Sequence, residues 1–231
     1  MTHTGGVTVR DRLALALDLP DLDAATRLYE DLAEHVGVAK VGLELWAAAG
    51  PASVRAFTDR GADVFLDLKL HDIPTTVGRA ATVLGRTGAR YVNFHVAGGP
   101  AMLRAAVEGL AAGAKEAGLP APTALGVTVL TSEPDAPDAL LAERVTTALE
   151  AGCGGLVCGA PDLALIRPLA PGATLVVPGT RPPGADRNDQ GRTATPAEAL
   201  AAGADLLVVG RAVTAAPDPR AALLDYVAPI T

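Results

Sequence analysis

Four ionisable residues stand at or near the ends of short apolar runs in the sequence: Asp18, Lys40, Asp67 and Lys69. Acidic and basic side chains that alternate in space stabilise one another's charged forms, so each lysine is expected to keep its proton. A protonated lysine can donate a proton to a carbanion, whereas Schiff-base chemistry requires the neutral amine. A purely structural ion-pair network is the alternative, but four such groups gathered on one functional face favour catalysis.

A second set of residues has the composition of a phosphate-binding site. The segments PGTRPPG at 178–184 and VGRAV at 209–213 each combine glycine with an arginine, Arg181 or Arg211. Glycine lets backbone N–H groups approach an anion closely, and arginine supplies the opposite charge. Either segment alone is typical of a surface arginine after a turn, but together they predict a phosphate clamp. The segment 179–195 is long for a loop and rich in Gly, Pro and Asp, which favours a lid.

Strand-like apolar runs alternate along the chain with stretches of helical spacing. The eight runs cover 12–18, 37–42, 62–69, 91–96, 123–130, 154–159, 173–179 and 204–210. Apolar residues with helical spacing are found over 22–36, 103–110 and 141–149. Residues typical of helix starts are Asp21, Pro100 and Pro196. Eight units in 231 residues give about 29 residues per unit, which matches a (β/α)8 TIM barrel. A doubly wound open sheet is the alternative, but the first strand is followed by LDLPD and not by a glycine-rich loop.

The predicted fold class is therefore α/β, a single-domain (β/α)8 TIM barrel over 11–231 that follows a polar tail over 1–10. Catalytic groups of such barrels lie at the C-terminal ends of the strands. This arrangement would bring the four charged residues and both glycine–arginine segments to one mouth, with Asn93 at the end of the fourth strand. Asp67 and Lys69 are two positions apart, so their side chains should point to the same face of their strand.

Composition limits the possible partners and location. The chain is 49% hydrophobic and 19% charged, as expected for a globular protein with a sizeable core. Its net charge of −7 argues against nucleic acid and anionic membranes as partners, although a cleft can still be locally positive. Cys153 and Cys158 have no zinc-site spacing and are interpreted as reduced thiols of a cytoplasmic protein. The polar N-terminal segment MTHTGGVTVR is not expected to act as a signal peptide, and no apolar span of about 18 residues is present.

The motifs at the third and seventh strands carry a family resemblance. With DLKLHDIPTTV at the third strand and PGTRPPGADRNDQGRTATP at the seventh, the sequence closely resembles the orotidine 5′-phosphate decarboxylase family. The resemblance extends over nearly the whole chain and includes ALALD, AKVG, HVAGG, VTVLTS and DLLVVGRAVT. It implies removal of CO2 from C6 of orotidine 5′-phosphate to give UMP, the final step of de novo pyrimidine nucleotide synthesis. It also implies a cytoplasmic homodimeric carboxy-lyase that needs neither cofactor nor metal.

Carried over residue by residue, the resemblance implies four catalytic residues. Lys69 resembles the proton donor to C6, and Asp67 lies beside it near the substrate carboxylate. Lys40 completes the charged array and binds the ribose together with Asp18. Asp72 resembles the fourth member of a Lys-Asp-Lys-Asp array, which in this family reaches the active site of the neighbouring subunit.

The remaining residues that the resemblance assigns bind substrate. They are Thr76 at the neighbour's ribose, Thr131 at the pyrimidine edge, Gln190 between lid, base and phosphate, and Pro178, Arg181, Gly210 and Arg211 around the phosphate. The sequence departs from the common motif at Thr75, where Asn is frequent, and this affects only a supporting hydrogen bond.

Two alternative functions remain compatible with the fold. Sugar-phosphate decarboxylases and aldolases of the same barrel superfamily share an Asp-x-Lys-x-x-Asp core but use Mg2+. A barrel that binds a nucleotide without catalysis would need to have lost charged groups that are all present here. Metal ligation by Asp67, His71 and Asp72 is disfavoured because Lys69 among them would repel a cation.

Overall fold

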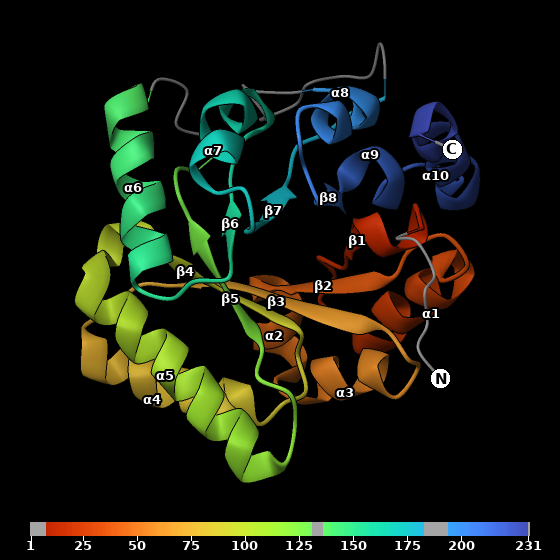
Figure 1. The fold of residues 1–231 in the computed structure, drawn as a ribbon. Coiled ribbons are helices and arrows are strands. Elements are labelled where there is room, and N and C mark those ends of the chain that lie inside the picture. Colours follow the sequence, from red (N-terminus) through yellow and green to blue (C-terminus); the bar gives the residue numbers. More distant parts are fainter. Residues whose placement is uncertain (1–7, 131–135, 183–193, 231) are drawn as a thin grey trace, which may run out of the picture.

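The computed structural model describes residues 8–130, 136–182 and 194–230, which form a closed barrel of eight parallel strands surrounded by helices (Figure 1). The strands are β1 (Leu13–Ala16), β2 (Val38–Gly42), β3 (Asp63–Leu70), β4 (Tyr91–His95), β5 (Thr123–Val127), β6 (Gly155–Val157), β7 (Thr174–Val177) and β8 (Leu206–Val209). Because β1 pairs with both β2 and β8, the sheet has no edge. The TIM-barrel prediction is confirmed, and the open sheet is excluded.

Helices follow the strands in the order that the barrel requires. The α-helices are α1 (Leu22–Leu32), α2 (Leu43–Ala49), α3 (Ala52–Thr58), α4 (Pro74–Gly85), α5 (Gly99–Ala117), α6 (Asp138–Glu150), α7 (Leu163–Leu169), α8 (Pro196–Ala201), α9 (Arg211–Thr214) and α10 (Pro219–Val227). Short 3-10 helices are η1 (Arg10–Arg12), η2 (Val96–Gly98), η3 (Ala160–Asp162) and η4 (Ala228–Ile230). Among the described residues, no helix has both the length and the apolar character needed to span a membrane.

The predicted helix starts are confirmed by the caps. The Asp21 carboxylate accepts a hydrogen bond from the backbone N–H of Ala24 at 2.7 Å and so satisfies a free donor in the first turn of α1. Thr195 and Glu198 form a reciprocal capping box at the start of α8, with Pro196 as its first residue. Pro100 is the second residue of α5, where its missing N–H costs no hydrogen bond.

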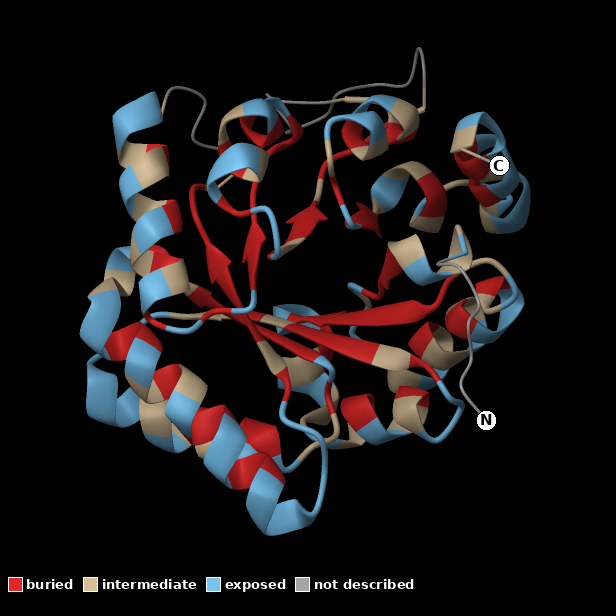
Figure 2. Ribbon diagram, viewed as in Figure 1, coloured by how far each residue is buried: buried red, intermediate tan, exposed pale blue. Residues whose placement is uncertain are grey.

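The apolar core has two layers separated by the barrel wall. Side chains outside the wall pack against the helices, whose residues alternate between buried and exposed sides (Figure 2). The inner layer fills the interior of the barrel. It consists of Ala14, Ala16, Val38, Phe65, Tyr91, Leu125, Val127, Val157, Val176, Leu206 and Val208. Successive side chains alternate between the two faces of a strand, so the residues that follow this cluster by two positions also face inward.

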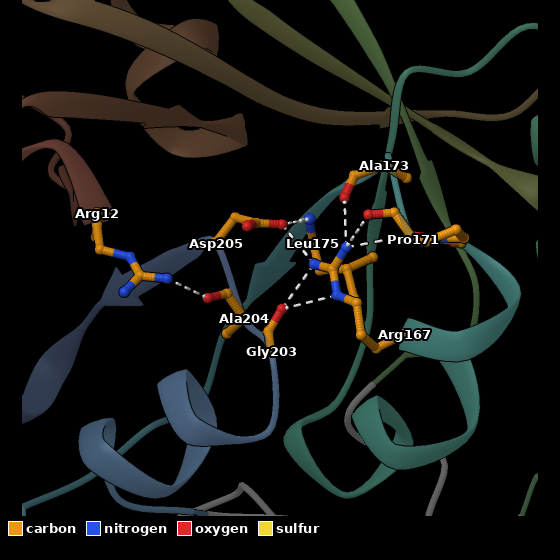
Figure 3. A network of polar contacts seen from close by, with 9 residues as sticks. Arg12, Arg167, Pro171, Ala173, Leu175, Gly203, Ala204 and Asp205 are labelled. Carbon is orange, nitrogen blue, oxygen red and sulfur yellow. Dashed lines mark hydrogen bonds and ion pairs between the residues drawn. The ribbon is translucent and has the colours of Figure 1, made fainter. Parts of the chain in front are cut away.

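Polar contacts stabilise the end of the barrel at which the strands begin, its N-terminal end (Figure 3). Arg167 of α7 donates to the Gly203 carbonyl and pairs with Asp205, at 2.6 and 2.5 Å respectively. The Asp205 carboxylate also accepts from the backbone N–H of Leu175 at 2.8 Å. These bonds hold the beginnings of β7 and β8 together, as expected for the end of a barrel that serves stability.

Candidate active site

A cleft of about 530 Å³ opens at the C-terminal ends of the strands. It is lined by Ala16, Asp18, Lys40, Glu44, Phe65, Asp67, Lys69, Val157, Pro178, Gly179, Arg181, Val208, Gly210, Arg211 and Thr214. The four charged residues and both glycine–arginine segments singled out from the sequence therefore meet in one place. The inward rows of the barrel explain this, because Lys40 follows Val38 by two positions and Asp67 follows Phe65.

A larger cavity of about 680 Å³ lies at the N-terminal end of the barrel. Its carboxylates already accept hydrogen bonds from protein groups: Asp63 from Arg90, Asp205 from Arg167, and Asp11 from Thr8. The N-terminal end of such a barrel serves stability and the C-terminal end carries the chemistry, so the functional site is assigned to the smaller cleft.

The charged residues of the cleft form one continuous chain of ion pairs. The Lys40 ammonium lies 3.0 Å from Asp18 Oδ1 and 3.2 Å from Asp67 Oδ2. The Lys69 ammonium lies 2.5 Å from Asp67 Oδ1. The order is thus Asp18–Lys40–Asp67–Lys69, in which each internal group lies between two opposite charges.

Burial and pairing act in opposite directions on this chain. Burial alone would lower the pKa of Lys40, but the carboxylates of Asp67 and Asp18 outweigh it and raise the pKa above its usual value. Burial would likewise raise the pKa of Asp67, yet the ammonium groups of Lys40 and Lys69 and two donated hydrogen bonds lower it to about 2. Lys40 and Asp67 therefore both carry charge at neutral pH, and the cleft holds a preorganised electrostatic array.

The Asp18–Lys40 ion pair fits in the cleft only because residue 42 is a glycine. A Cβ atom on Gly42, at the end of β2, would lie 2.3 Å from Asp18 Oδ1 and 3.1 Å from Lys40 Nζ. Both distances are shorter than ordinary contacts, so a side chain at this position and the Asp18–Lys40 pair exclude each other.

The backbone of β3 is irregular where the charges lie. Its pairing with β4 runs through Leu66↔Val92 and resumes at Leu70↔Phe94, so the register shifts between them. Lys69 has φ 49°, the one positive φ among the described non-glycine residues. Regular alternation was the reason for expecting Asp67 and Lys69 on one face; their side chains do meet, but across a bulged backbone.

Asn93 of β4 lies at the centre of this irregularity. Its Oδ1 accepts from the Lys69 backbone N–H and its Nδ2 donates to Asp67 Oδ1, both at 2.7 Å. The sequence placed Asn93 at a strand end without assigning it a role. The signal that could have found it is its position two residues after Tyr91, where a fully buried polar side chain interrupts an inward-facing apolar row.

The glycine–arginine segments form the other wall of the cleft. Pro178, Gly179 and Arg181 follow β7, and Gly210 and Arg211 follow β8. Gly179 has φ 80°, a conformation that favours glycine. Both segments therefore line one cleft.

Arg181 is buried, with 6% of its surface exposed, and its Nη1 donates to the Thr180 carbonyl at 3.1 Å. Its Nε has no hydrogen-bond partner among the described residues. The Thr180 hydroxyl bonds to the Tyr226 hydroxyl of α10, which fixes the segment that carries Arg181. A buried guanidinium with a free N–H beside a cleft is suited to an anionic ligand.

Two of the predicted residues, Asp72 and Thr76, do not line this cleft. Asp72 is exposed and its Oδ1 accepts from the backbone N–H of Ile73 at 2.6 Å, while Thr76 is exposed in the first turn of α4. Thr131 and Gln190 lie outside the described residues, as does most of the predicted lid.

The chain is similar in sequence to decarboxylases along nearly its whole length. The model of the family described as "Orotidine 5′-phosphate decarboxylase / HUMPS family" matches residues 11–226. The orotidine 5′-phosphate decarboxylase of Anaeromyxobacter sp. (strain K) is 47% identical over 223 residues, covering 92% of this chain and 95% of that protein. The enzyme of the same name from Moorella thermoacetica is 46% identical over 226 residues, covering 92% and 89% respectively.

Solved structures agree with the sequence comparison. The crystal structure of orotidine 5′-phosphate decarboxylase from Lactobacillus acidophilus superposes with a TM-score of 0.77 at 31% identity, covering 93% of this chain and 96% of that one. An uncharacterized conserved protein from Geobacillus kaustophilus gives the same TM-score at 35% identity, covering 93% and 97%.

Proposed function

The chain belongs to the orotidine 5′-phosphate decarboxylase / HUMPS family, and on that premise we propose that it converts orotidine 5′-phosphate to UMP and CO2 without a cofactor. The observation that carries the proposal is the position of the Lys69 ammonium. It lies 2.5 Å from Asp67 in the same cleft as the two arginines suited to phosphate. The proposed reaction requires a proton donor for C6 and a binding site for the phosphate, and this cleft offers both.

The substrate would lie across the cleft with its phosphate at the clamp. Pro178, Arg181, Gly210 and Arg211 would surround the phosphate, and Asp18 with Lys40 would bind the ribose hydroxyls. This orientation directs C6 of the pyrimidine toward the Asp67–Lys69 pair. Binding energy at the phosphate, far from the reacting carbon, can then be used to hold that carbon against the charged array.

The bond changes follow from this orientation. The C6–carboxylate bond breaks, CO2 leaves, and the electron pair of the bond stays on C6. The Lys69 ammonium stabilises this negative charge and then transfers a proton to C6, forming the C6–H bond of UMP. The neutral Lys69 amine regains a proton from water, so one proton is consumed for each CO2 released.

Asp67, itself held by Lys40, would keep the proton donor in place. Asp67 stays ionised because its pKa is lowered to about 2, and it holds Lys69 through one oxygen and Lys40 through the other. Fixed charges of this kind need no reorganisation when the carbanion forms. The array supplies electrostatic stabilisation from the chain's own residues, which is why we propose a reaction free of cofactor and metal.

We propose further that the active form is a homodimer in which Asp72 and Thr76 reach the neighbouring active site. Both residues are exposed, and Ile73 between them leaves 65% of its surface accessible, which suits an interface. Thr131 would bond the pyrimidine edge, and Gln190 would connect lid, base and phosphate. The buried, reduced cysteines Cys153 and Cys158 support a reducing, cytoplasmic location.

The direct test is to measure the consumption of orotidine 5′-phosphate through the change in its ultraviolet absorbance. The assay uses purified protein treated with excess EDTA. The proposal predicts rapid conversion with UMP as the product and no stimulation by added Mg2+. Absence of turnover, with activity appearing only on a sugar phosphate plus Mg2+, would overturn it in favour of the metal-dependent branch of the superfamily.

A further inference from the structure

The Asn93 side chain joins two groups of the charged array that have opposite hydrogen-bonding needs. The Asp67 carboxylate can only accept, and the Lys69 backbone N–H can only donate. The Asn93 amide offers Nδ2 to the first and Oδ1 to the second, both at 2.7 Å. Asn93 is fully buried, so water does not compete for either bond. An ionised carboxylate or an apolar side chain of similar size lacks the donor that Asp67 requires and cannot make both bonds.

The backbone irregularity of β3 creates the need for this amide. Between the paired positions Leu66↔Val92 and Leu70↔Phe94, β3 contains Asp67, Leu68 and Lys69, whereas β4 contains Asn93 alone. Regular pairing is interrupted there, and the Lys69 N–H is received by a side chain. Lys69 also keeps φ 49°, which an L residue adopts only when its surroundings impose it. The bond to Asn93 Oδ1 is such a constraint.

The second bond fixes the orientation of the Asp67 carboxylate. Asn93 Nδ2 and the Lys69 ammonium both approach Oδ1, at 2.7 and 2.5 Å, while Lys40 lies 3.2 Å from Oδ2. Without the donor from Asn93, the carboxylate is free to turn between its two lysines. The ammonium of Lys69, which is partly exposed at the cleft, would then lose its fixed position.

We propose that Asn93 is a positioning residue for the decarboxylation, holding both the backbone and the ion-pair partner of the proton donor Lys69. The inference rests on the proposed function and adds a requirement to it, since Asn93 does not line the cleft and acts through Asp67 and Lys69. It predicts that Asn93 contributes to stabilising charge at C6 and contributes little to binding phosphate and ribose.

The test compares Asn93→Asp and Asn93→Leu with the wild-type protein. Asn93→Asp has nearly the same shape and keeps an acceptor for the Lys69 N–H, but it places a second carboxylate against Asp67. Asn93→Leu removes both bonds. Ser53→Ala is the matched control, because Ser53 is also a fully buried polar residue, but its hydroxyl bonds to the Gly50 carbonyl away from the cleft.

Two ligands separate positioning from general damage. UMP reports binding of phosphate and ribose, and 6-hydroxyuridine 5′-phosphate carries a negative oxygen at C6 where the carbanion forms. We expect both Asn93 variants to lower kcat and the affinity for the 6-hydroxy ligand by about 10²-fold, the effect of one oxyanion donor. Affinity for UMP should change by no more than about threefold, because uniform binding is untouched. Ser53→Ala should leave both affinities and kcat unchanged.

Equal losses of affinity for UMP and the 6-hydroxy ligand would show a merely structural role and overturn the inference, as would near-normal kcat in Asn93→Leu. A wild-type protein without turnover would overturn the proposed function instead. Hydrogen exchange at the Lys69 amide gives a readout independent of activity. The amide should be protected in the wild type and exchange faster in Asn93→Leu; equal protection in the two proteins would contradict the proposed hold on the backbone.

Discussion

The Lys69 ammonium lies 2.5 Å from Oδ1 of Asp67, although the strand that carries both residues departs from regular pairing between them. The pair is therefore made by a bulged backbone with Lys69 at φ 49°, and not by the simple alternation of a strand. Strain of this kind is found where function requires it. Catalysis depends on this pair, because Lys69 is the proposed proton donor and Asp67 keeps it in place.

The first prediction concerns the space beside the Asp18–Lys40 pair. In Gly42→Ala the new Cβ would lie 2.3 Å from Asp18 Oδ1, and the half-exposed Asp18 side chain can turn away to relieve the contact. The fold should persist while the proposed ribose contact is lost. We expect kcat/KM for orotidine 5′-phosphate to fall by roughly tenfold or more, corresponding to one charged hydrogen bond.

Gly172→Ala is the control for this substitution. Gly172 lies before β7, and an added Cβ there meets no atom within 4 Å. It should leave kcat/KM unchanged. Equal kinetics for the two variants would show that the Asp18–Lys40 pair has no part in substrate binding.

The second prediction is a pH dependence of stability that comes from Asp67. Its pKa is about 2 in the folded protein, against an ordinary value of 3.8. A carboxylate with a lowered folded pKa stabilises the fold above its unfolded pKa, and this contribution is lost as pH falls through the folded pKa. The contribution is about 2 kcal/mol.

Urea unfolding of the wild type and Asp67→Asn from pH 5 to pH 2 measures this contribution. The difference in free energy of unfolding should be largest near pH 5 and should shrink by about 2 kcal/mol toward pH 2. A difference that does not change with pH would contradict the ion pairing of Asp67 with Lys40 and Lys69.

The third prediction tests whether Asp72 acts across a dimer interface. Lys69→Ala and Asp72→Ala should each be nearly inactive alone. A re-associated equal mixture should recover about a quarter of wild-type activity, because half of the dimers are mixed and each mixed dimer has one intact site. If Asp72 served its own subunit's site, every site in the mixture would lack one residue and no activity would return.

The barrel and its charged mouth could be predicted from sequence because both rest on local patterns. Apolar runs at even intervals give the strands, and strand ends of a barrel converge, so Asp18, Lys40, Asp67 and Lys69 were expected together. The same logic brought Arg181 and Arg211 to one cleft. These inferences need only the periodicity of side chains and the topology of parallel strands.

Other features depend on contacts that periodicity does not contain. The residue with positive φ in the bulge of β3 is Lys69 and not a glycine, so the sequence carries no local signal for the bulge. Asn93 lies in the strand YVNFH, and its contacts with Asp67 and Lys69 become evident when β3 and β4 are set in register. The requirement for Gly42 likewise follows from three-dimensional proximity to Asp18 and not from any local signal.

The most direct test of the central claim is kcat for orotidine 5′-phosphate in Lys69→Ala. The variant should remain folded, with unchanged circular dichroism and retained UMP binding, because Lys69 is not one of the proposed phosphate or ribose contacts. Loss of the proton donor should lower kcat by about 10³-fold or more, since general acid catalysis alone typically contributes about 10²- to 10⁴-fold. Near-normal turnover in this folded variant would contradict the assignment of Lys69 as the group that protonates C6.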